Sequence, residues 1–69
     1  MYHVNVSKLN GLIAEKNTTK EALSEAIGIN RSTFFRRLKS NSLTIGDIHG
    51  ICEFLQLTKE EAIDIFLAV

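Results

Sequence analysis

The sequence predicts an all-α fold: one compact bundle of five short helices that forms a single domain over residues 1–69. Three observations predict it. A chain of 69 residues has room for only one small core. Proline is absent and hydrophobic residues make up 45% of the chain, which favours short helices with short connections over a disordered segment. Apolar residues also recur at intervals of three and four in five separate segments.

The first expected helix covers residues 7–16. Its polar start lies at Asn5 or Ser7, and Asn17 ends it because asparagine tolerates the left-handed backbone conformation. Gly11 lies inside this helix, either because a neighbouring helix approaches closely or as an ordinary surface glycine. The apolar positions at helical spacing are Val6, Leu9, Leu12 and Ile13.

The second and third expected helices lie on either side of Gly28. Thr19 is suited to cap the second helix at its N-terminus, and Gly28 to end it. Asn30 is suited to cap the third helix, in which Phe34 and Leu38 lie four residues apart on one face. The apolar face of the second helix consists of Ala22, Leu23, Ala26 and Ile27.

The fourth and fifth expected helices each begin with a capping-box pattern. Thr44 and Asp47 form the first such pattern, ahead of a helix over residues 45–55. Thr58 and Glu61 form the second, ahead of a helix that continues to the C-terminus. The two apolar stripes are Ile48, Ile51, Cys52 and Leu55, then Ala62, Ile63, Phe66 and Leu67.

Charge is unevenly distributed along a chain whose formal net charge is zero. Residues 1–41 hold seven Lys or Arg against three Glu, which gives +4. Residues 42–69 hold one Lys against five Asp or Glu, which gives −4. This separation suggests one basic side that can meet phosphates and one acidic side that faces solvent or another protein.

Several classes of protein are disfavoured. The single cysteine, Cys52, allows no internal disulfide, and no cluster of residues has metal-ligand spacing. We interpret His3 and His49 as ordinary surface or partly buried residues and Cys52 as core packing. No catalytic constellation occurs, so we expect no enzyme, no cofactor and no small-molecule substrate. No apolar run has signal-peptide or membrane-span length, which predicts a cytoplasmic protein with no membrane partner.

Two blocks of residues in phase resemble the lambda-repressor-like helix-turn-helix family, especially small Cro-like and repressor-like regulators of bacteriophages. The first block is Leu9, Leu12, Thr19, Leu23, Ile27, Gly28, Ile29 and Asn30, and the second is Thr44, Ile45, Ile48, Ile51, Cys52, Leu55, Leu57 and Thr58. The chain departs from the family pattern at Lys20 and Ser24, where glutamine and alanine are usual, and at Leu38, which follows Arg37. The resemblance implies a DNA-binding domain whose helix-turn-helix is formed by the second and third helices. It also implies a nucleoid-associated protein in a prokaryotic cell or phage-infected host.

The third helix is then the recognition helix, with four positive charges and no acidic residue. Residues at the N-terminus of such a helix reach base edges, and an arginine can pair with guanine through two hydrogen bonds. Residues near its end and at the start of the preceding helix contact phosphates. The alternative is a solvated helix face balanced by nearby glutamates. The candidate DNA-binding residues include the cap Asn30. The candidate base-reading residues are Arg31, Ser32 and Thr33, and Arg36 is open to a base or a phosphate. The candidate backbone contacts are Thr19, Lys20, Arg37, Lys39 and Asn41.

Phe35 allows two interpretations. Adjacent side chains of a helix cannot both point into one core, so Phe34 and Phe35 face different ways. Phe35 either covers the edge of the core or touches the methyl group of a thymine.

The function predicted from these features is a sequence-specific regulator of transcription that binds double-stranded DNA, a phage or prophage Cro-like repressor at an operator. A homodimer is a further hypothesis, because two recognition helices can read half-sites about 34 Å apart. Its expected interface is the apolar C-terminal run Ile65, Phe66, Leu67 and Val69. The alternative is a helix buried in its own core. The rival function is a protein-interaction module, an anti-repressor or modulator that binds a partner repressor protein.

Overall fold

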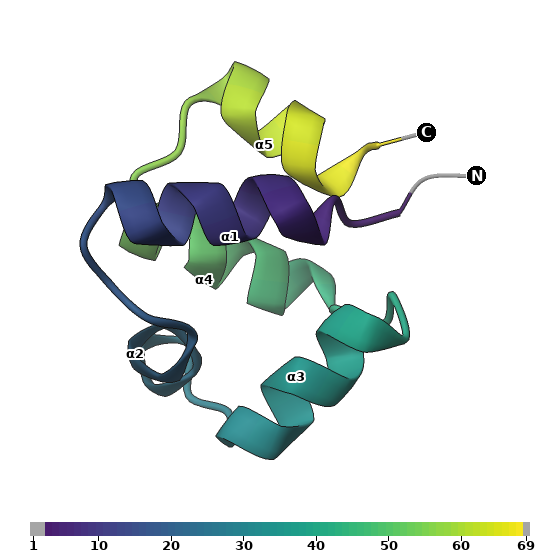
Figure 1. Cartoon of the computed structure of the whole chain (residues 1–69). Coiled ribbons are helices and arrows are strands. Elements are labelled where there is room, and N and C mark those ends of the chain that lie inside the picture. The colour runs from purple at the N-terminus through teal and green to yellow at the C-terminus, as the bar shows by residue number, and fades with distance from the viewer. Residues whose placement is uncertain (1–2, 69) are drawn as a thin grey trace.

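A computed structural model describes residues 3–68 and contains five α-helices (Figure 1). They are α1 Val6–Glu15, α2 Lys20–Ala26, α3 Arg31–Lys39, α4 Ile45–Leu55 and α5 Lys59–Phe66. The predicted all-α class is confirmed. Only the ends differ: α1 begins and ends one residue earlier than expected, and α5 ends at Phe66 instead of continuing to the C-terminus.

Each helix begins with a side chain that caps its free backbone N–H groups. The caps are Asn5, Thr19, Asn30, Thr44 and Thr58. Thr44 and Thr58 form complete capping boxes with Asp47 and Glu61, as the sequence predicts. Of the two expected starts of α1, Asn5 is the one observed, because its Oδ1 accepts a hydrogen bond from Lys8 N at 3.1 Å. Such caps typically stabilise a helix by about 1 kcal/mol each.

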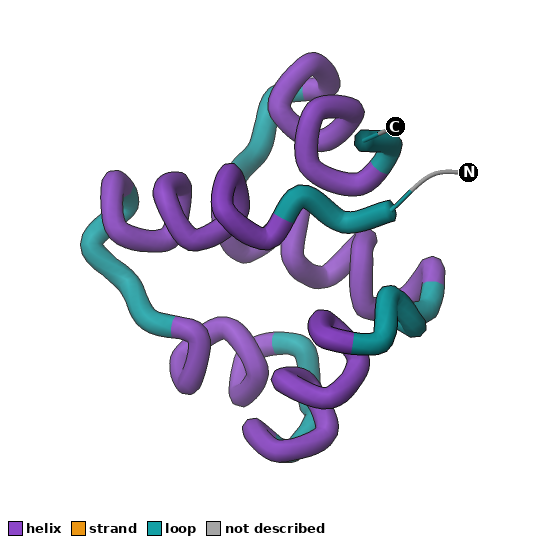
Figure 2. The backbone as a smooth tube through the Cα atoms, turned by 45° about the vertical axis from the view of Figure 1, so that its right-hand side comes forward, coloured by secondary structure: helices purple, strands orange, loops and turns teal. Residues whose placement is uncertain are grey.

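The first four helices end on a residue with left-handed backbone geometry. These residues are Asn17, Gly28, Asn41 and Gln56, with φ between 52° and 79°. After α2, Gly28 N donates to Glu25 O and Ile29 N donates to Ser24 O, both at 3.1 Å. This pair of hydrogen bonds is a Schellman motif, which turns the chain sharply away from the helix axis. It sets the turn between α2 and α3 (Figure 2).

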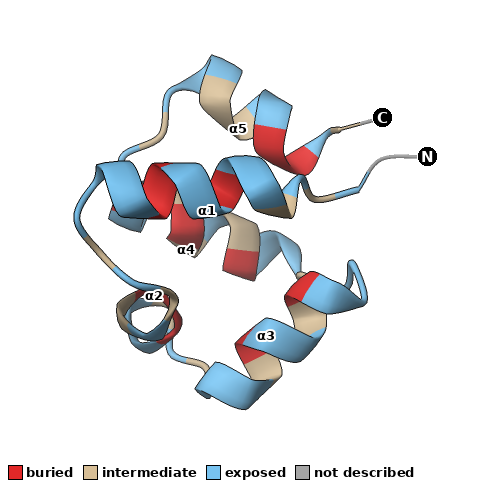
Figure 3. Ribbon diagram, in the orientation of Figure 1, coloured by how far each residue is buried: buried red, intermediate tan, exposed pale blue. Residues whose placement is uncertain are grey.

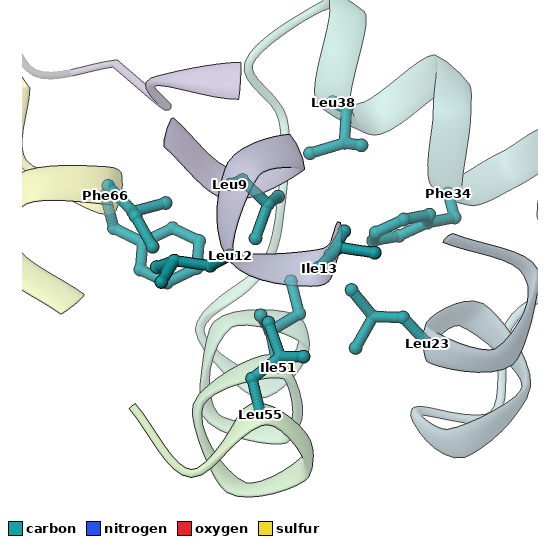
Figure 4. Packing of buried hydrophobic residues seen from close by; sticks show 10 residues of the cluster. Leu9, Leu12, Ile13, Leu23, Phe34, Leu38, Ile51, Leu55 and Phe66 are labelled. Atoms are coloured by element: carbon teal, nitrogen blue, oxygen red, sulfur yellow. The ribbon is translucent and has the colours of Figure 1, made fainter. Parts of the chain in front are cut away.

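The core lies between α1 and the other four helices. Figure 4 shows the side chains of α1 at its centre, with Phe66 of α5 on one side and Phe34 and Leu23 on the other. The fully buried members include Phe34, Leu9 and Ile65. The remaining core residues are Leu12, Ile13, Leu23, Leu38, Ile51, Leu55 and Phe66. One continuous core therefore holds α2 and α3 against the rest of the domain.

The segment before α1 forms hydrogen bonds with two other parts of the chain. His3 and Ala68 exchange two backbone hydrogen bonds of 2.9 and 3.2 Å, an isolated antiparallel bridge. Val4 N donates to Asn41 Oδ1 at 2.9 Å, in the loop that follows α3. The first described residues thus tie the end of α5 to the loop after α3.

Replacing two helical glycines by alanine is expected to change the stability of the domain in opposite directions. A Cβ at Gly50 in α4 would lie 2.6 Å from Ile27 Cγ2 and 3.2 Å from its Cβ, whereas a Cβ at Gly11 in α1 would meet nothing within 4 Å. The isoleucine is β-branched and cannot easily turn aside. We expect Gly50→Ala to destabilise the domain by about 1 kcal/mol, because overpacking exceeds the gain in helix propensity. We expect Gly11→Ala to stabilise it by about 1 kcal/mol.

Urea unfolding followed by circular dichroism measures both effects, and each variant is the other's control. Equal shifts of the two midpoints in the same direction would contradict the close packing of α4 on α2. Of the two interpretations of Gly11, the structure supports the surface glycine, and the close approach occurs at Gly50.

Candidate nucleic-acid interface

The two helices α2 and α3 form a helix-turn-helix at one side of the domain. Figure 1 shows α2 nearly end on while α3 runs across the view, so the two helices cross steeply. Phe34 and Leu38 of α3 face the core and are buried. The opposite side of α3 is exposed over most of its length (Figure 3). The fold thus leaves the charged side of α3 accessible from outside.

The N-terminal residues of α3 lie at the accessible end of this surface. Asn30 caps the helix, with its Oδ1 accepting from Ser32 N at 2.8 Å and from Thr33 N at 3.4 Å. Arg31 and Ser32 are exposed and Thr33 is half-buried. Arg31 Nη1 lies 3.6 Å from Glu21 Oε1, and both side chains are more than half exposed. Exposed pairs of this kind contribute little stability, so the guanidinium can exchange this partner for another anion.

Arg36 and Lys39 continue the cationic surface toward the end of α3. Both are exposed, and within residues 3–68 neither has a carboxylate oxygen within 4.0 Å. Lys20, at the first position of α2, is half-buried. Together with Arg31 these side chains form what we call the cationic face: Lys20, Arg31, Arg36 and Lys39.

Arg37 does not belong to the cationic face. Its Nη1 lies 2.8 Å from Asp47 Oδ2, a carboxylate oxygen that also accepts from Thr44 N at 3.1 Å. Asp47 is only 6% exposed. The guanidinium expected at the DNA backbone therefore braces α3 against the start of α4. Its partner ten residues away could not be found from spacing along one helix, because the contact joins two helices.

The surroundings of Asp47 favour its ionised form. Burial alone raises the pKa of this carboxyl, but hydrogen bonds from Thr44 and Arg37 and the charge of Arg37 outweigh burial and lower the pKa below its ordinary value of 3.8. The carboxylate is thus charged at neutral pH and holds the guanidinium in place.

Two other expected contact residues are engaged within the domain. Thr19 Oγ1 accepts from Ala22 N at 3.1 Å and caps α2. Asn41 Oδ1 accepts from Val4 N, and Asn41 has a φ of +56° in the loop after α3. Both residues shape the backbone beside the cationic face, whatever else they contact.

Phe35 lies next to the cationic face and is 38% exposed, whereas Phe34 is fully buried. The two ring centroids are 6.2 Å apart. Lys20 Nζ lies 5.6 Å from the centroid of the Phe35 ring, within range of a cation–π interaction. The ring borders a shallow depression of about 310 Å³ lined by Val6, Lys20, Phe35, Leu38 and Lys39. The sequence predicted Lys20 and Phe35 separately but not their contact.

Residues 8–66 match the family of Cro/C1-type HTH DNA-binding domains. The matched range includes all of α2 to α5 and most of α1. The chain belongs to this family. No curated protein and no solved structure matches the chain. The family match confirms the predicted resemblance. It also shows that the domain is of the type found in DNA-binding regulators.

This Cro/C1-type domain has a second notable surface, an apolar groove of about 470 Å³ between α4 and α5. It is lined by Ile48, Lys59, Ala62, Ile63, Phe66 and Leu67. The predicted dimer interface needs correction here: Ile65 is fully buried and Phe66 is 8% exposed. They face their own core because α5 packs on α1. Leu67 is 47% exposed, and Val69 lies outside the described residues.

Neither a metal centre nor a membrane span is found in the described part of this Cro/C1-type domain. Within residues 3–68, no group of three or more His, Cys, Asp or Glu side chains is placed to hold a metal ion. In the same part of the chain, no helix has the length and apolar character needed to cross a membrane.

Proposed function

We propose that this chain is a sequence-specific regulator of transcription that binds double-stranded DNA, a Cro-like repressor of a phage or prophage that occupies an operator with α3 in the major groove. The observation that carries the proposal is the cationic face. Its four side chains lie on or beside the recognition helix, and α3 itself carries no acidic residue. Such a face can displace the counterions condensed on DNA phosphates.

Different parts of the face have different tasks. Arg31, Ser32 and Thr33 are at the N-terminus of α3, the part of a recognition helix that reaches base edges. Arg31 suits guanine O6 and N7, and Arg36, one turn later, reaches a base or a phosphate. Lys20 and Lys39 border one depression and bind phosphates there. Arg37 positions α3 through Asp47, while Thr19, Asn30 and Asn41 fix the ends of α2 and α3.

Selection of bound sequences from a random DNA pool, followed by gel retardation, tests the proposal. We expect a preferred sequence to emerge and its affinity to fall as salt rises. Four phosphate contacts per protomer would give a slope of log affinity against log salt of about −3.6, which is the upper bound for the cationic face. Binding of the whole pool without preference would contradict the proposal.

We also propose that two copies bind one operator. Leu67 and Ile63 are exposed beside the α4–α5 groove, and a second copy can cover this apolar surface. A two-fold pair places its recognition helices on half-sites one helical turn apart, about 34 Å. Selected sequences with two inverted half-sites would support the pair, and a single half-site would contradict it.

The same groove favours a second candidate function, a protein-interaction module that binds a larger repressor. The groove is lined by apolar residues and Lys59. It lies in a segment, residues 42–69, with a charge of −4, which suits a partner protein rather than DNA. The retardation experiment separates the two functions, because a module of this kind would bind duplex DNA weakly and without preference.

A further inference from the structure

Phe35 is an apolar ring among positive charges on the side of α3 assigned to DNA. It lies four residues after Arg31 and four before Lys39, so the three side chains form one stripe along the helix. Of this stripe only the ring has no charge. A side chain in this place meets either water or a group of the bound DNA.

The burial and neighbours of the Phe35 ring favour contact with DNA. Phe34 occupies the core position and is fully buried, so Phe35 is not needed to fill the core. The Phe35 ring keeps 38% of its surface exposed and has the ammonium of Lys20 over one face. The ring borders a depression whose lining includes Lys20 and Lys39 together with Val6 and Leu38.

An exposed ring on a recognition helix needs an apolar partner in the groove. In the major groove each base pair presents hydrogen-bonding groups, and only the A·T pair adds a methyl group, at C5 of thymine. Contact between the ring and this methyl group removes apolar surface of both from water. No base other than thymine offers such a partner in unmodified DNA.

We propose that Phe35 reads the 5-methyl group of a thymine that lies beside the phosphate bound by Lys20. The inference rests on the proposed function and names one base and the residue that recognises it. The ammonium 5.6 Å from the ring centroid links the two contacts. Lys20 holds the strand, and the ring then meets the base next to the held phosphate.

Substitution of single thymines by uracil in the selected operator tests the proposal, because it removes the methyl group and nothing else. At one thymine of each half-site, we expect the unchanged protein to lose affinity about fourfold, the effect of one buried methyl group. Phe35→Ala should bind the thymine operator more weakly and show no further loss with uracil at that position. Each variant is compared with itself on two DNAs, so a change in folded fraction cancels.

Phe54→Ala is the matched control, because Phe54 is 41% exposed but lies on α4 outside the helix-turn-helix. It should keep the full uracil effect. The inference is overturned if no uracil weakens binding of the unchanged protein, or if Phe35→Ala keeps the same uracil effect. If the pool yields no preferred sequence, the proposed function itself fails. If a preferred sequence emerges but shows no uracil effect that depends on Phe35, only the inference about Phe35 fails.

A photochemical experiment needs no variant. 5-Bromouracil in place of the critical thymine keeps a bulky group at C5 and forms a crosslink to a neighbouring side chain on irradiation. Mass spectrometry of the crosslinked peptide should identify Phe35. A crosslink to another residue of α3 at that base would overturn the assignment.

Discussion

Asp47→Ala is expected to destabilise the domain by about 3 kcal/mol, a large share of the roughly 3–5 kcal/mol available to a core of this size. The substitution removes the carboxylate 2.8 Å from Arg37 Nη1 and opens the capping box of α4 at Thr44. Breaking a buried ion pair typically costs 3–5 kcal/mol, and the partial exposure of Arg37 reduces that figure. Loss of the hydrogen bond that Asp47 Oδ2 accepts from Thr44 N adds to it. Thermal unfolding should show a midpoint lower by roughly 10–20 °C.

Glu61→Ala is the matched control for this prediction. Glu61 forms the same capping box with Thr58 in α5 but has no arginine within ion-pair distance among residues 3–68. Its replacement should therefore lower the unfolding midpoint less than Asp47→Ala does. Equal effects of the two substitutions would show that the capping box, and not the ion pair, stabilises the start of α4.

The same carboxylate gives the domain a pH dependence. The folded state lowers the pKa of Asp47 below 3.8, so the folded protein binds its proton less readily than the unfolded chain does. This contribution to stability is complete above the unfolded pKa and is lost as pH falls through the lower, folded pKa. In Asp47→Ala the corresponding loss at acidic pH should be absent when unfolding is followed from pH 6 to pH 2.

Arg31→Ala and Arg36→Ala are expected to weaken operator binding by one to two orders of magnitude each, which corresponds to about 1–3 kcal/mol for a base contact. Removal of a base contact should also relax the sequence preference at one position. Removal of a phosphate contact should weaken binding to every sequence and reduce the salt slope by about one. Fluorescence anisotropy with the selected operator and single-base variants of it, at several salt concentrations, distinguishes the two roles.

Lys8→Ala is the control, because Lys8 is exposed on α1 and lies near enough to Glu61 of α5 that, after the hydrogen bond from Thr58, its charge also lowers the pKa of that carboxyl. It has the same change in charge but no place on the cationic face, so its affinity should change little. Unaltered binding in both arginine variants would remove α3 from the proposed role. A loss in Lys8→Ala as large as theirs would point to a general effect of net charge.

Local signals in the sequence predicted most of the fold. Thr44 with Asp47 and Thr58 with Glu61 mark helix starts because a capping box lies within four consecutive residues. Gly28 marks the end of α2 because the left-handed conformation there favours glycine. The cationic side of α3 was predicted in the same way, from the charge of neighbouring residues and the place of the segment after Gly28. Phe34 and Phe35 likewise had to face apart.

Contacts between helices were harder to predict. The ion pair between Arg37 and Asp47 depends on how α3 and α4 cross, and spacing along the chain determines no crossing angle. The approach of Gly50 to Ile27 also joins two helices. Ile65 was assigned to an interface between copies because an apolar residue near the C-terminus suits a partner as well as it suits its own core. The side of α5 that packs on α1 carries Ile65 and Phe66, and this packing decides the choice.

The bridge between His3 and Ala68 holds the two ends of the described residues, 3–68, side by side. A short linker between these two residues would hardly disturb the folded arrangement, because its ends already lie side by side. The linker would also restrict the unfolded chain and so lower the entropy that folding must overcome. New termini could then be opened at an exposed turn such as the one at Gln56, which would present the five helices in a different order along the chain around the same core.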